Sequence, residues 1–252
     1  MDEEFVVAIQ RELEDNVDPS PKRSPQSFFK EGIRAHGVKS ALVEKIAAAR
    51  FREIGGRDKP EILSLCEALL ATDYMEEAIV ACAWSYALRD RYAESDFDVF
   101  ERWLNKYVNN WAKCDTLCNH TIGAIVEMFP QCLERLKGWA QSENRWVRRA
   151  SAVTLILPAR RGMFLADVLQ ITDILLLDKD DLVRKGYGWM LKEASRKHQS
   201  VVFEYVMGKK AVMPRTALRY AIEKMPQDLR RRAMERQSIA SAGGADATTM
   251  SI

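Results

Sequence analysis

A segment near the middle of the chain, residues 146–153, has the sequence WVRRASAV. A similar segment, LVRKGYGW, occupies residues 182–189, so that a Val-Arg-basic-small pattern recurs after 36 residues. Weaker copies occur at residues 77–80 and 214–218. Self-similarity at this period is typical of stacked helical hairpins, in which small residues let neighbouring second helices approach each other. Coincidence among alanine-rich helices is the alternative, but the recurrence in register favours repeats.

The composition of the 252 residues supports this interpretation. Hydrophobic residues make up 47% and charged residues 29%, which is the balance of a folded globular protein. Good helix formers dominate, and the period-2 alternation of strands is rare. We therefore expect an all-α fold, a right-handed superhelical stack of HEAT-like antiparallel helix pairs (an α-α superhelix) with a concave groove that suits an extended ligand.

Proline and glycine positions predict how the chain is divided. We expect a single HEAT-like-repeat domain over residues 1–236. Its first amphipathic helix covers residues 5–13, and an exposed linker with three prolines follows at about residues 16–26. Residues 237–252 are small and polar without an apolar face, which predicts a disordered tail.

No targeting or membrane signal is recognisable in the sequence. The first residues are acidic where a secretory signal is basic. No apolar run approaches the roughly 18 residues that a membrane-spanning helix needs. Five cysteines, an odd number without an export signal, favour reduced thiols. We therefore expect a cytoplasmic protein that has no membrane partner and acts as a monomer.

The charge is distributed unevenly along the chain. The formal net charge is only +2, but residues 1–144 carry 18 Lys and Arg against 25 Asp and Glu, whereas residues 145–236 carry 20 against 10. Such a local excess of positive charge suggests a polyanionic partner. A solvated basic face is the alternative, and charge alone does not decide between the two.

Metal and nucleotide chemistry find little support in the sequence. Cys114, Cys118 and His120 lie close together, but no second ligand pair follows at a zinc-finger spacing. We therefore expect the two cysteines to be packing residues. The three histidines are too scattered for a catalytic triad, and the chain has no glycine-rich phosphate loop. Neither a metal nor another cofactor is expected.

One pair of residues suggests a functional site. Trp111 and Asp115 are four residues apart and share a face of the expected helix. A carboxylate among largely uncharged neighbours is costly to bury unless it is paired or used. Taken singly, a tryptophan is most often a core residue and an aspartate is often a helix N-cap. The combination is rarer than either residue.

Basic residues accompany two further tryptophans. Arg145, Arg148 and Arg149 surround Trp146, while Lys185 and Lys192 flank Trp189. If the hairpins stack, these second helices line one surface, which then carries tryptophans, one carboxylate and a cationic rim.

Over residues 3–236 the chain resembles the AlkD-like DNA alkylation repair family, DNA glycosylases built from HEAT-like repeats. In chain order, the resemblance rests on residues 5–13, 28–30 with 36–38, 111–115, 145–150 and 185–193. The last of these, KGYGWMLKE, is the most specific. The family carries a similar basic, small, Gly-Trp helix that is followed by a basic residue and Glu.

The resemblance implies roles for four residues at the site of chemistry. Asp115 matches the family's catalytic carboxylate. Trp111 and Trp189 match its two tryptophans that face the damaged nucleotide. Phe28 falls where the family usually places a tyrosine in the cleft, so the tyrosine hydroxyl is absent here.

The resemblance also implies contacts with the DNA backbone. Arg149 matches an arginine with that role, and Lys192 stands where an arginine is common. A lysine offers a point charge in place of a planar fork. Together with Arg148 and Lys185, these residues are expected to hold phosphates without reading the base sequence.

The implied activity is base excision repair of duplex DNA: hydrolysis of the glycosidic bond of purines that carry a positive charge from alkylation at N3 or N7. Such a base leaves without protonation, so one carboxylate suffices where other glycoside hydrolases use two. Asp115 would stabilise the positive charge that develops on the deoxyribose and orient a water. The tryptophan faces would attract the cationic nucleotide, each by about 0.5–2 kcal/mol.

Two alternatives remain open. The chain could be a non-catalytic HEAT-repeat module that binds damaged or branched DNA, or a protein-binding scaffold with an apolar concave face. The orientation of four side chains discriminates between them. These side chains are Trp111, Asp115, Arg149 and Trp189. Their convergence on an open groove favours a DNA-binding or DNA-modifying function, and burial of the tryptophans favours the protein-binding scaffold.

Overall fold

The computed structural model describes residues 2–18, 29 and 32–235, and within them every regular element is a helix. The expected first helix is present as α1 (Asp2–Glu14), and residues 16–18 of the expected linker are non-helical. The rest of that linker and the expected tail lie outside the described residues. None of the described helices combines the length and the apolar character that crossing a bilayer requires.

The described part of the first half of the chain consists of helices, and from α2 onward they are joined by short connections. After α1 follow α2 (Ser40–Ile54), α3 (Lys59–Ala71), α4 (Met75–Ala87), the single turn η2 (Arg89–Arg91), α5 (Asp96–Tyr107), α6 (Trp111–Thr116), the π-helical turn η3 (Leu117–Ile122) and α7 (Gly123–Met128).

The second half continues in the same manner. It contains the single turn η4 (Pro130–Cys132), then α8 (Leu133–Trp139), α9 (Arg145–Val153), α10 (Ile156–Arg160), α11 (Leu165–Leu175), α12 (Asp181–Ala194), α13 (Gln199–Lys209), α14 (Arg215–Ala221) and α15 (Gln227–Met234).

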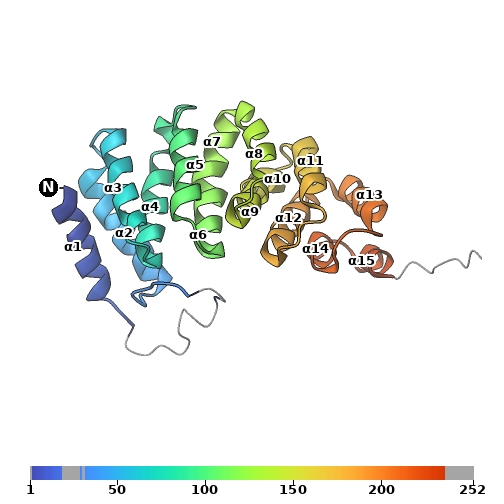
Figure 1. Cartoon of the computed structure of the whole chain (residues 1–252), viewed down its shortest axis with the longest axis horizontal. Helices are drawn as coiled ribbons and strands as arrows, with labels where there is room; N and C mark the ends of the chain where they lie inside the picture. Colours follow the sequence, from blue (N-terminus) through green and yellow to red (C-terminus); the bar gives the residue numbers. More distant parts are fainter. Residues whose placement is uncertain (1, 19–28, 30–31, 236–252) are drawn as a thin grey trace, which may run out of the picture.

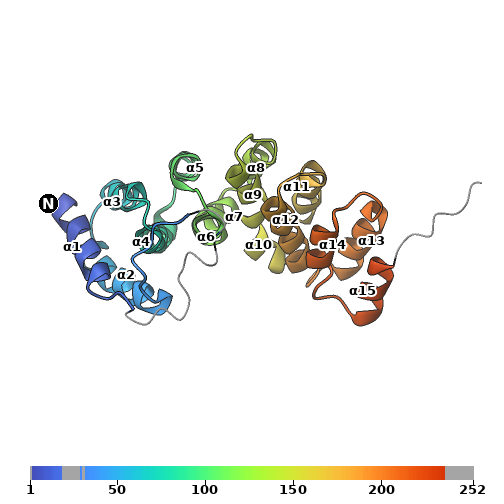
Figure 2. The same cartoon turned by 60° about the horizontal axis from the view of Figure 1, so that its bottom comes forward.

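The helices form two layers (Figure 1). In one, here called the inner layer, α2, α4, α6, α9, α12 and α14 each pack against the next. The other layer covers it, with α3 on α4, α8 on α9, and both α11 and α13 on α12. Figure 2 shows the row bending so that the α2 and α14 ends turn toward the side of the inner layer. The expected all-α stack of helix pairs is therefore confirmed.

Three successive inner-layer helices begin with the same type of cap. The side-chain oxygen of Asn110 accepts a hydrogen bond from the Lys113 backbone N–H (2.9 Å), and that of Asn144 accepts from the Trp146 N–H (2.9 Å). Asp180 accepts from the Leu182 N–H (2.8 Å) in the same way. An N-cap satisfies backbone donors that the first turn leaves without partners. The caps therefore fix where α6, α9 and α12 begin, one repeat apart.

Hydrogen bonds between buried polar groups connect neighbouring helix pairs. The indole Nε1 of the fully buried Trp84 in α4 donates to the Ala47 carbonyl of α2 (2.8 Å). The hydroxyl groups of Ser85 in α4 and Thr121 in η3 lie 2.9 Å apart. Because a buried polar group is costly without a partner, such bonds set how each pair sits against the next.

Candidate functional site

The tryptophans divide into a buried group and an accessible group. Trp84, Trp103, Trp139 and Trp146 are buried in the core. Trp111 and Trp189 are only partly buried and pack against the edge of the core. These are the two tryptophans that the sequence predicts for substrate binding. Their role in substrate binding stays a prediction, and their partial exposure leaves each indole within reach of a ligand.

Helix α6 carries both Trp111 and Asp115. Because Asn110 caps the helix, Trp111 occupies its first turn and Asp115 follows one turn later, on the same face. The Asp115 side chain is 15% exposed. A carboxylate of α6 therefore lies beside an accessible indole, as the spacing predicts.

The carboxylate of Asp115 forms a bidentate ion pair with Arg149 of α9. Arg149 Nε donates to Oδ1 (2.9 Å), and Nη2 donates to Oδ2 (2.7 Å). The arginine side chain is only 6% exposed. Two parallel hydrogen bonds from a planar fork fix the rotation of the carboxylate as well as its position.

Burial and pairing act on the pKa of Asp115 in opposite directions. Burial raises the pKa of the carboxyl above its ordinary value, since the ionised form loses hydration. The hydrogen bonds and the positive charge of Arg149 lower it, but they offset only part of that rise. The net effect is a pKa above the ordinary value for aspartate, and Arg149 favours the ionised form of the carboxyl.

Arg149 also reaches the next inner-layer helix. Its Nη1 donates to the backbone carbonyl of Leu182 in α12. Gly186 of α12 faces the same side chain, since a Cβ built there would lie 3.5 Å from Arg149 Nη1. Trp189 follows Gly186 by about one turn. One arginine thus connects the helix of Asp115 to the helix of Trp189. Its expected contact with DNA stays a prediction, because much of its hydrogen-bonding capacity is used within the protein.

The sequence resemblance assigned Phe28 to the site, and Phe28 lies outside the described residues. Its neighbour Phe29 is described and stacks on Trp111, with ring centroids 5.1 Å apart and planes 16° apart. Sequence reasoning quoted this phenylalanine pair but did not select Phe29. One face of the Trp111 indole is therefore already covered by an aromatic ring.

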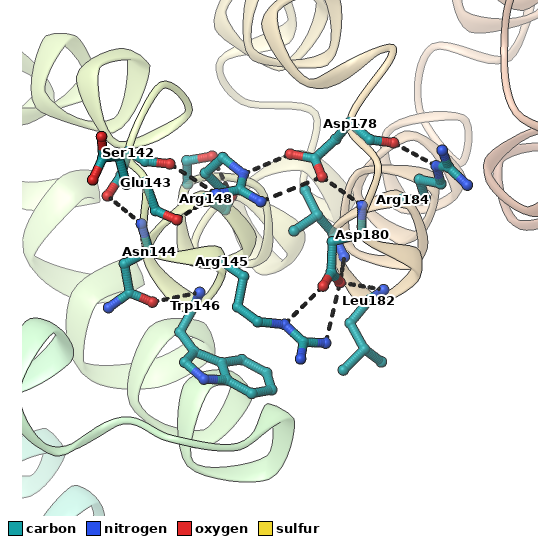
Figure 3. A network of polar contacts seen from close by, with 12 residues as sticks. Ser142, Glu143, Asn144, Arg145, Trp146, Arg148, Asp178, Asp180, Leu182 and Arg184 are labelled. Atoms are coloured by element: carbon teal, nitrogen blue, oxygen red, sulfur yellow. Dashed lines mark hydrogen bonds and ion pairs between the residues drawn. The ribbon is translucent and has the colours of Figure 1, made fainter. Parts of the chain in front are cut away.

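Arg148 is engaged by the loops that surround the beginning of α9 (Figure 3). Its Nε donates to Asp178 Oδ2 (2.6 Å), and its Nη1 donates to the carbonyls of Ser142 (2.8 Å) and Glu143 (2.9 Å). The side chain is partly buried. These contacts join the loops that precede α9 and α12. Its phosphate contact remains a prediction, while its structural contacts were not foreseen.

Arg145 makes a parallel connection in the same network. Its Nε lies 2.8 Å from Asp180 Oδ2, and its guanidinium carbon lies 4.6 Å from the centre of the Trp146 ring. Asp180 is also the N-cap of α12 (Figure 3). Asp178 and Asp180, in the loop before α12, therefore both bind arginines of α9. Asp180 has a second role, because it also caps the start of α12.

The two predicted lysines lie on α12. Lys185 Nζ pairs with Asp181 one turn earlier (2.8 Å), and its side chain is 37% exposed. Lys192 Nζ lies 3.2 Å from Glu223 Oε2, and it lies 5.9 Å from the ring centre of Trp189 and 5.6 Å from that of Tyr220. A phosphate would have to compete with these carboxylates for the lysines.

Tyr220 of α14 is a neighbour of the site that sequence reasoning missed. It is placed by a close approach of α12 and α14, since a Cβ at Gly188 would lie 2.7 Å from Tyr220 Cβ and 2.9 Å from the Ala217 carbonyl oxygen. The available signal was the repeat itself, because Tyr220 follows Trp189 by the same 31 residues that separate residues 183 and 214.

The cysteines offer no exposed thiol to this site. Cys66, Cys82, Cys114, Cys118 and Cys132 are all buried and free. Packing roles for Cys114 and Cys118, as expected from their helical spacing, agree with this burial. Within the described ranges, no group of three or more His, Cys, Asp and Glu side chains is arranged to hold a metal ion.

Comparisons with known proteins identify relatives of this fold. A family model described as "DNA alkylation repair enzyme" matches residues 9–225. A solved structure from Enterococcus faecalis, described as a "Predicted DNA alkylation repair enzyme", is 14% identical with a TM-score of 0.69, and the match covers 89% of this chain and 96% of that chain. AlkD2 from Streptococcus mutans is 18% identical with a TM-score of 0.60, covering 87% and 98%.

At these identities the two structures establish a shared fold, and no curated protein sequence matches the chain. The family model is the stronger finding, because it extends from α1 to the end of the turn after α14 and so includes every helix of the inner layer. The chain belongs to the DNA alkylation repair enzyme family.

Proposed function

We propose that the protein is a DNA glycosylase that hydrolyses the glycosidic bond of cationic N3- or N7-alkylated purines in duplex DNA. The observation that carries the proposal is the Asp115 carboxylate, which Arg149 holds by two hydrogen bonds one helical turn from the accessible indole of Trp111. Membership of the DNA alkylation repair family supports the same substrate class.

The proposed reaction needs little beyond a placed negative charge. An alkylated purine carries a formal positive charge, so the electron pair of the breaking C1′–N bond returns to the base, which leaves as a neutral alkylpurine. Positive charge then develops on the deoxyribose. Water adds to C1′ and releases one proton to solvent. A preorganised carboxylate lowers the energy of the oxocarbenium-like state without itself forming a bond.

Pairing with Arg149 leaves Asp115 able to act in this way. Each carboxylate oxygen accepts one hydrogen bond from the arginine and keeps a second lone pair. The exposed 15% of the side chain gives a sugar or a water an approach. Arg149 is thus a positioning residue, which sets the direction in which the carboxylate presents its charge.

The remaining predicted residues would bind the DNA. Trp111 and Trp189 offer indole faces to a cationic nucleotide. Lys185 and Lys192 lie on the helix of Trp189, and a phosphate that displaced Asp181 or Glu223 would gain a lysine on that surface.

The decisive experiment measures release of 7-methylguanine from a methylated duplex under single-turnover conditions. Removal of a preorganised electrostatic group typically costs about 10²- to 10³-fold in rate, and we expect a loss of that size for Asp115→Asn. Asp90→Asn, which changes an exposed aspartate of η2, is the matched control and should leave the rate unchanged. Equal rates for wild type and Asp115→Asn would remove Asp115 from the proposed role.

A second candidate function is favoured by the same ion pair. Because both oxygens of Asp115 are bonded to Arg149, the carboxylate could serve only to fix α6 against α9 in a non-catalytic module that binds damaged or branched DNA. Wild-type protein that binds DNA with a steep salt dependence but releases no base above the spontaneous rate would support this candidate.

A further inference from the structure

The last two helices that the structure describes enclose a groove on the protein surface. Helices α14 and α15 lie next to each other at the end of the stack (Figure 1). The groove has a volume of about 980 Å³, and its charged lining residues are Arg219, Glu223, Asp228, Arg230 and Arg231. We call it the α14–α15 groove.

Three arginines of this groove are available to a ligand. Arg219, Arg230 and Arg231 are exposed, and none of them forms an ion pair with a carboxylate of the described residues. This distinguishes them from Arg145, Arg148 and Arg149, whose guanidinium groups are already bonded to aspartates. An unpaired guanidinium can bind a phosphate without first losing an internal partner.

The carboxylates of the groove do not cancel this charge. Glu223 is bonded to Lys192 (3.2 Å) and lies 3.5 Å from Lys224 Nζ, so lysines outside the groove compensate it. Asp228 lies in the first turn of α15, where a negative charge is favourable to the helix. The groove as a whole is therefore positive.

The positions of the arginines are set by contacts between helices. Arg215 at the start of α14 donates to the Met234 carbonyl (3.4 Å), and Lys210 Nζ donates to the Arg232 carbonyl (2.8 Å). Basic side chains that satisfy the last carbonyls of a helix stabilise its end. Arg215 thus ties α15 to the beginning of α14, and Lys210 ties it to the end of α13, which fixes the position of α15 at the groove.

The groove is also connected to the proposed site. Lys192 lies one turn from Trp189 on α12, and its ammonium group binds Glu223, which lines the groove. A double helix whose damaged nucleotide faced Trp189 would continue along the inner layer past α12. The next surface beyond α12 belongs to α14, and then to α15.

We propose that the α14–α15 groove binds the phosphodiester backbone of duplex DNA to one side of the damaged nucleotide. The inference rests on the proposed function, because it assigns a further part of the same DNA partner. Its ligand is a run of phosphates, bound without regard to base sequence.

The test compares two triple variants that lose the same charge. One removes the groove arginines, Arg219→Ala, Arg230→Ala and Arg231→Ala. The matched control removes three exposed cations from elements outside the inner layer: Arg11→Ala in α1, Arg89→Ala in η2 and Lys106→Ala in α5. Binding of each protein to an undamaged 25-base-pair duplex is measured by fluorescence anisotropy at several salt concentrations. Thermal melting checks that both triple variants remain folded. If a triple variant is unfolded, single Arg-to-Gln or Lys-to-Gln replacements at the same positions are used in its place.

Each lost phosphate contact makes the negative slope of log K against log [salt] shallower by about 0.9. The slope of the groove variant should therefore be shallower than that of the wild type by about 2 to 3, and the slope of the control variant should be unchanged. Equal slopes in wild type and groove variant would overturn the proposal. An equal fall in both variants would overturn it too, since overall charge would then be responsible. A groove variant that keeps its DNA slope but loses affinity for polyglutamate would assign the groove to an acidic protein instead.

The outcome is independent of catalysis. A wild-type protein that binds undamaged DNA with the expected slope but releases no base would refute the glycosylase proposal and leave the groove proposal intact. Base release by the wild type, with no effect of the groove arginines on DNA binding, would refute the groove proposal and leave the glycosylase proposal intact.

Discussion

Arg149 of α9 donates hydrogen bonds to both carboxylate oxygens of Asp115 in α6, 34 positions earlier in the chain. It is the contact on which the proposed chemistry depends, because it decides both the direction and the ionisation of the carboxylate. Neither helix alone would place a charge there.

The pH dependence of base release should report this contact. Only the ionised form of Asp115 stabilises a cationic sugar, so the rate falls as the pH drops through the Asp115 pKa. Arg149 lowers that pKa against the effect of burial. Arg149→Met should therefore raise the pKa further and move the acid limb of the rate profile to higher pH.

Arg149→Lys is the companion variant, since it keeps a positive charge but loses the planar fork. We expect a smaller shift of the acid limb and a reduced plateau rate, because the carboxylate rotates more freely. Breaking a buried ion pair costs about 3–5 kcal/mol, so the stability of both variants must be measured by urea unfolding first. An acid limb that stays in place in folded Arg149→Met would contradict the expected coupling.

Trp189 should contribute to affinity for a charged lesion. A cation over an indole face is worth about 0.5–2 kcal/mol, so Trp189→Ala should weaken release of 7-methylguanine by about 2- to 30-fold in kcat/KM. A duplex with a neutral hypoxanthine is the control ligand for this attraction. Its affinity is measured by fluorescence anisotropy, because the proposed mechanism does not release a neutral base, and Trp189→Ala should bind it as well as the wild type does. A loss of the same size on both duplexes would show that Trp189 acts by shape alone.

The stack of Phe29 on Trp111 can be measured as a coupling free energy. Stacked aromatic pairs gain about 0.5–1.5 kcal/mol beyond their buried area. A double-mutant cycle of Phe29→Ala and Trp111→Ala in urea unfolding should recover a coupling of that size. Additive effects of the two substitutions would mean that the two rings do not stabilise each other in solution.

Gly188 should not tolerate a side chain. The close approach of α12 to α14 leaves 2.7 Å between a Cβ at this position and the Cβ of Tyr220. Because overpacking costs about 1–3 kcal/mol, Gly188→Ala should lower the free energy of unfolding by that amount. Gly138→Ala in α8 is the control. Its Cβ would meet nothing within 4 Å, and alanine favours helices, so this variant should be neutral or stabilised.

Much of the fold could be predicted from local sequence. The Val-Arg pattern at residues 147 and 183 indicated the repeat, and the structure places both segments in successive inner-layer helices, α9 and α12. The helical spacing of Trp111 and Asp115 likewise predicted their common face. These features depend on residues a turn or a repeat apart, which a periodic pattern records.

Contacts between helices were harder to predict. Asp178 and Asp180 bind arginines of α9, but nothing in the order of the sequence shows which partner an aspartate in a loop will take. The stack of Phe29 on Trp111 was not predicted, because a contact between a loop residue and a helix leaves no periodic pattern in the sequence. Tyr220 escaped notice because its closeness to α12 depends on the absence of a Cβ at Gly188.

The contacts of Arg149 also have a mechanical consequence. In a stack where each helix pair contacts only its neighbours, a bend of the whole stack is the sum of small changes at successive contacts between pairs. Arg149 belongs to α9 and binds Asp115 of α6 on one side and the Leu182 carbonyl of α12 on the other. A change of curvature at this point would strain those bonds, so we expect α6, α9 and α12 to move together when the stack bends.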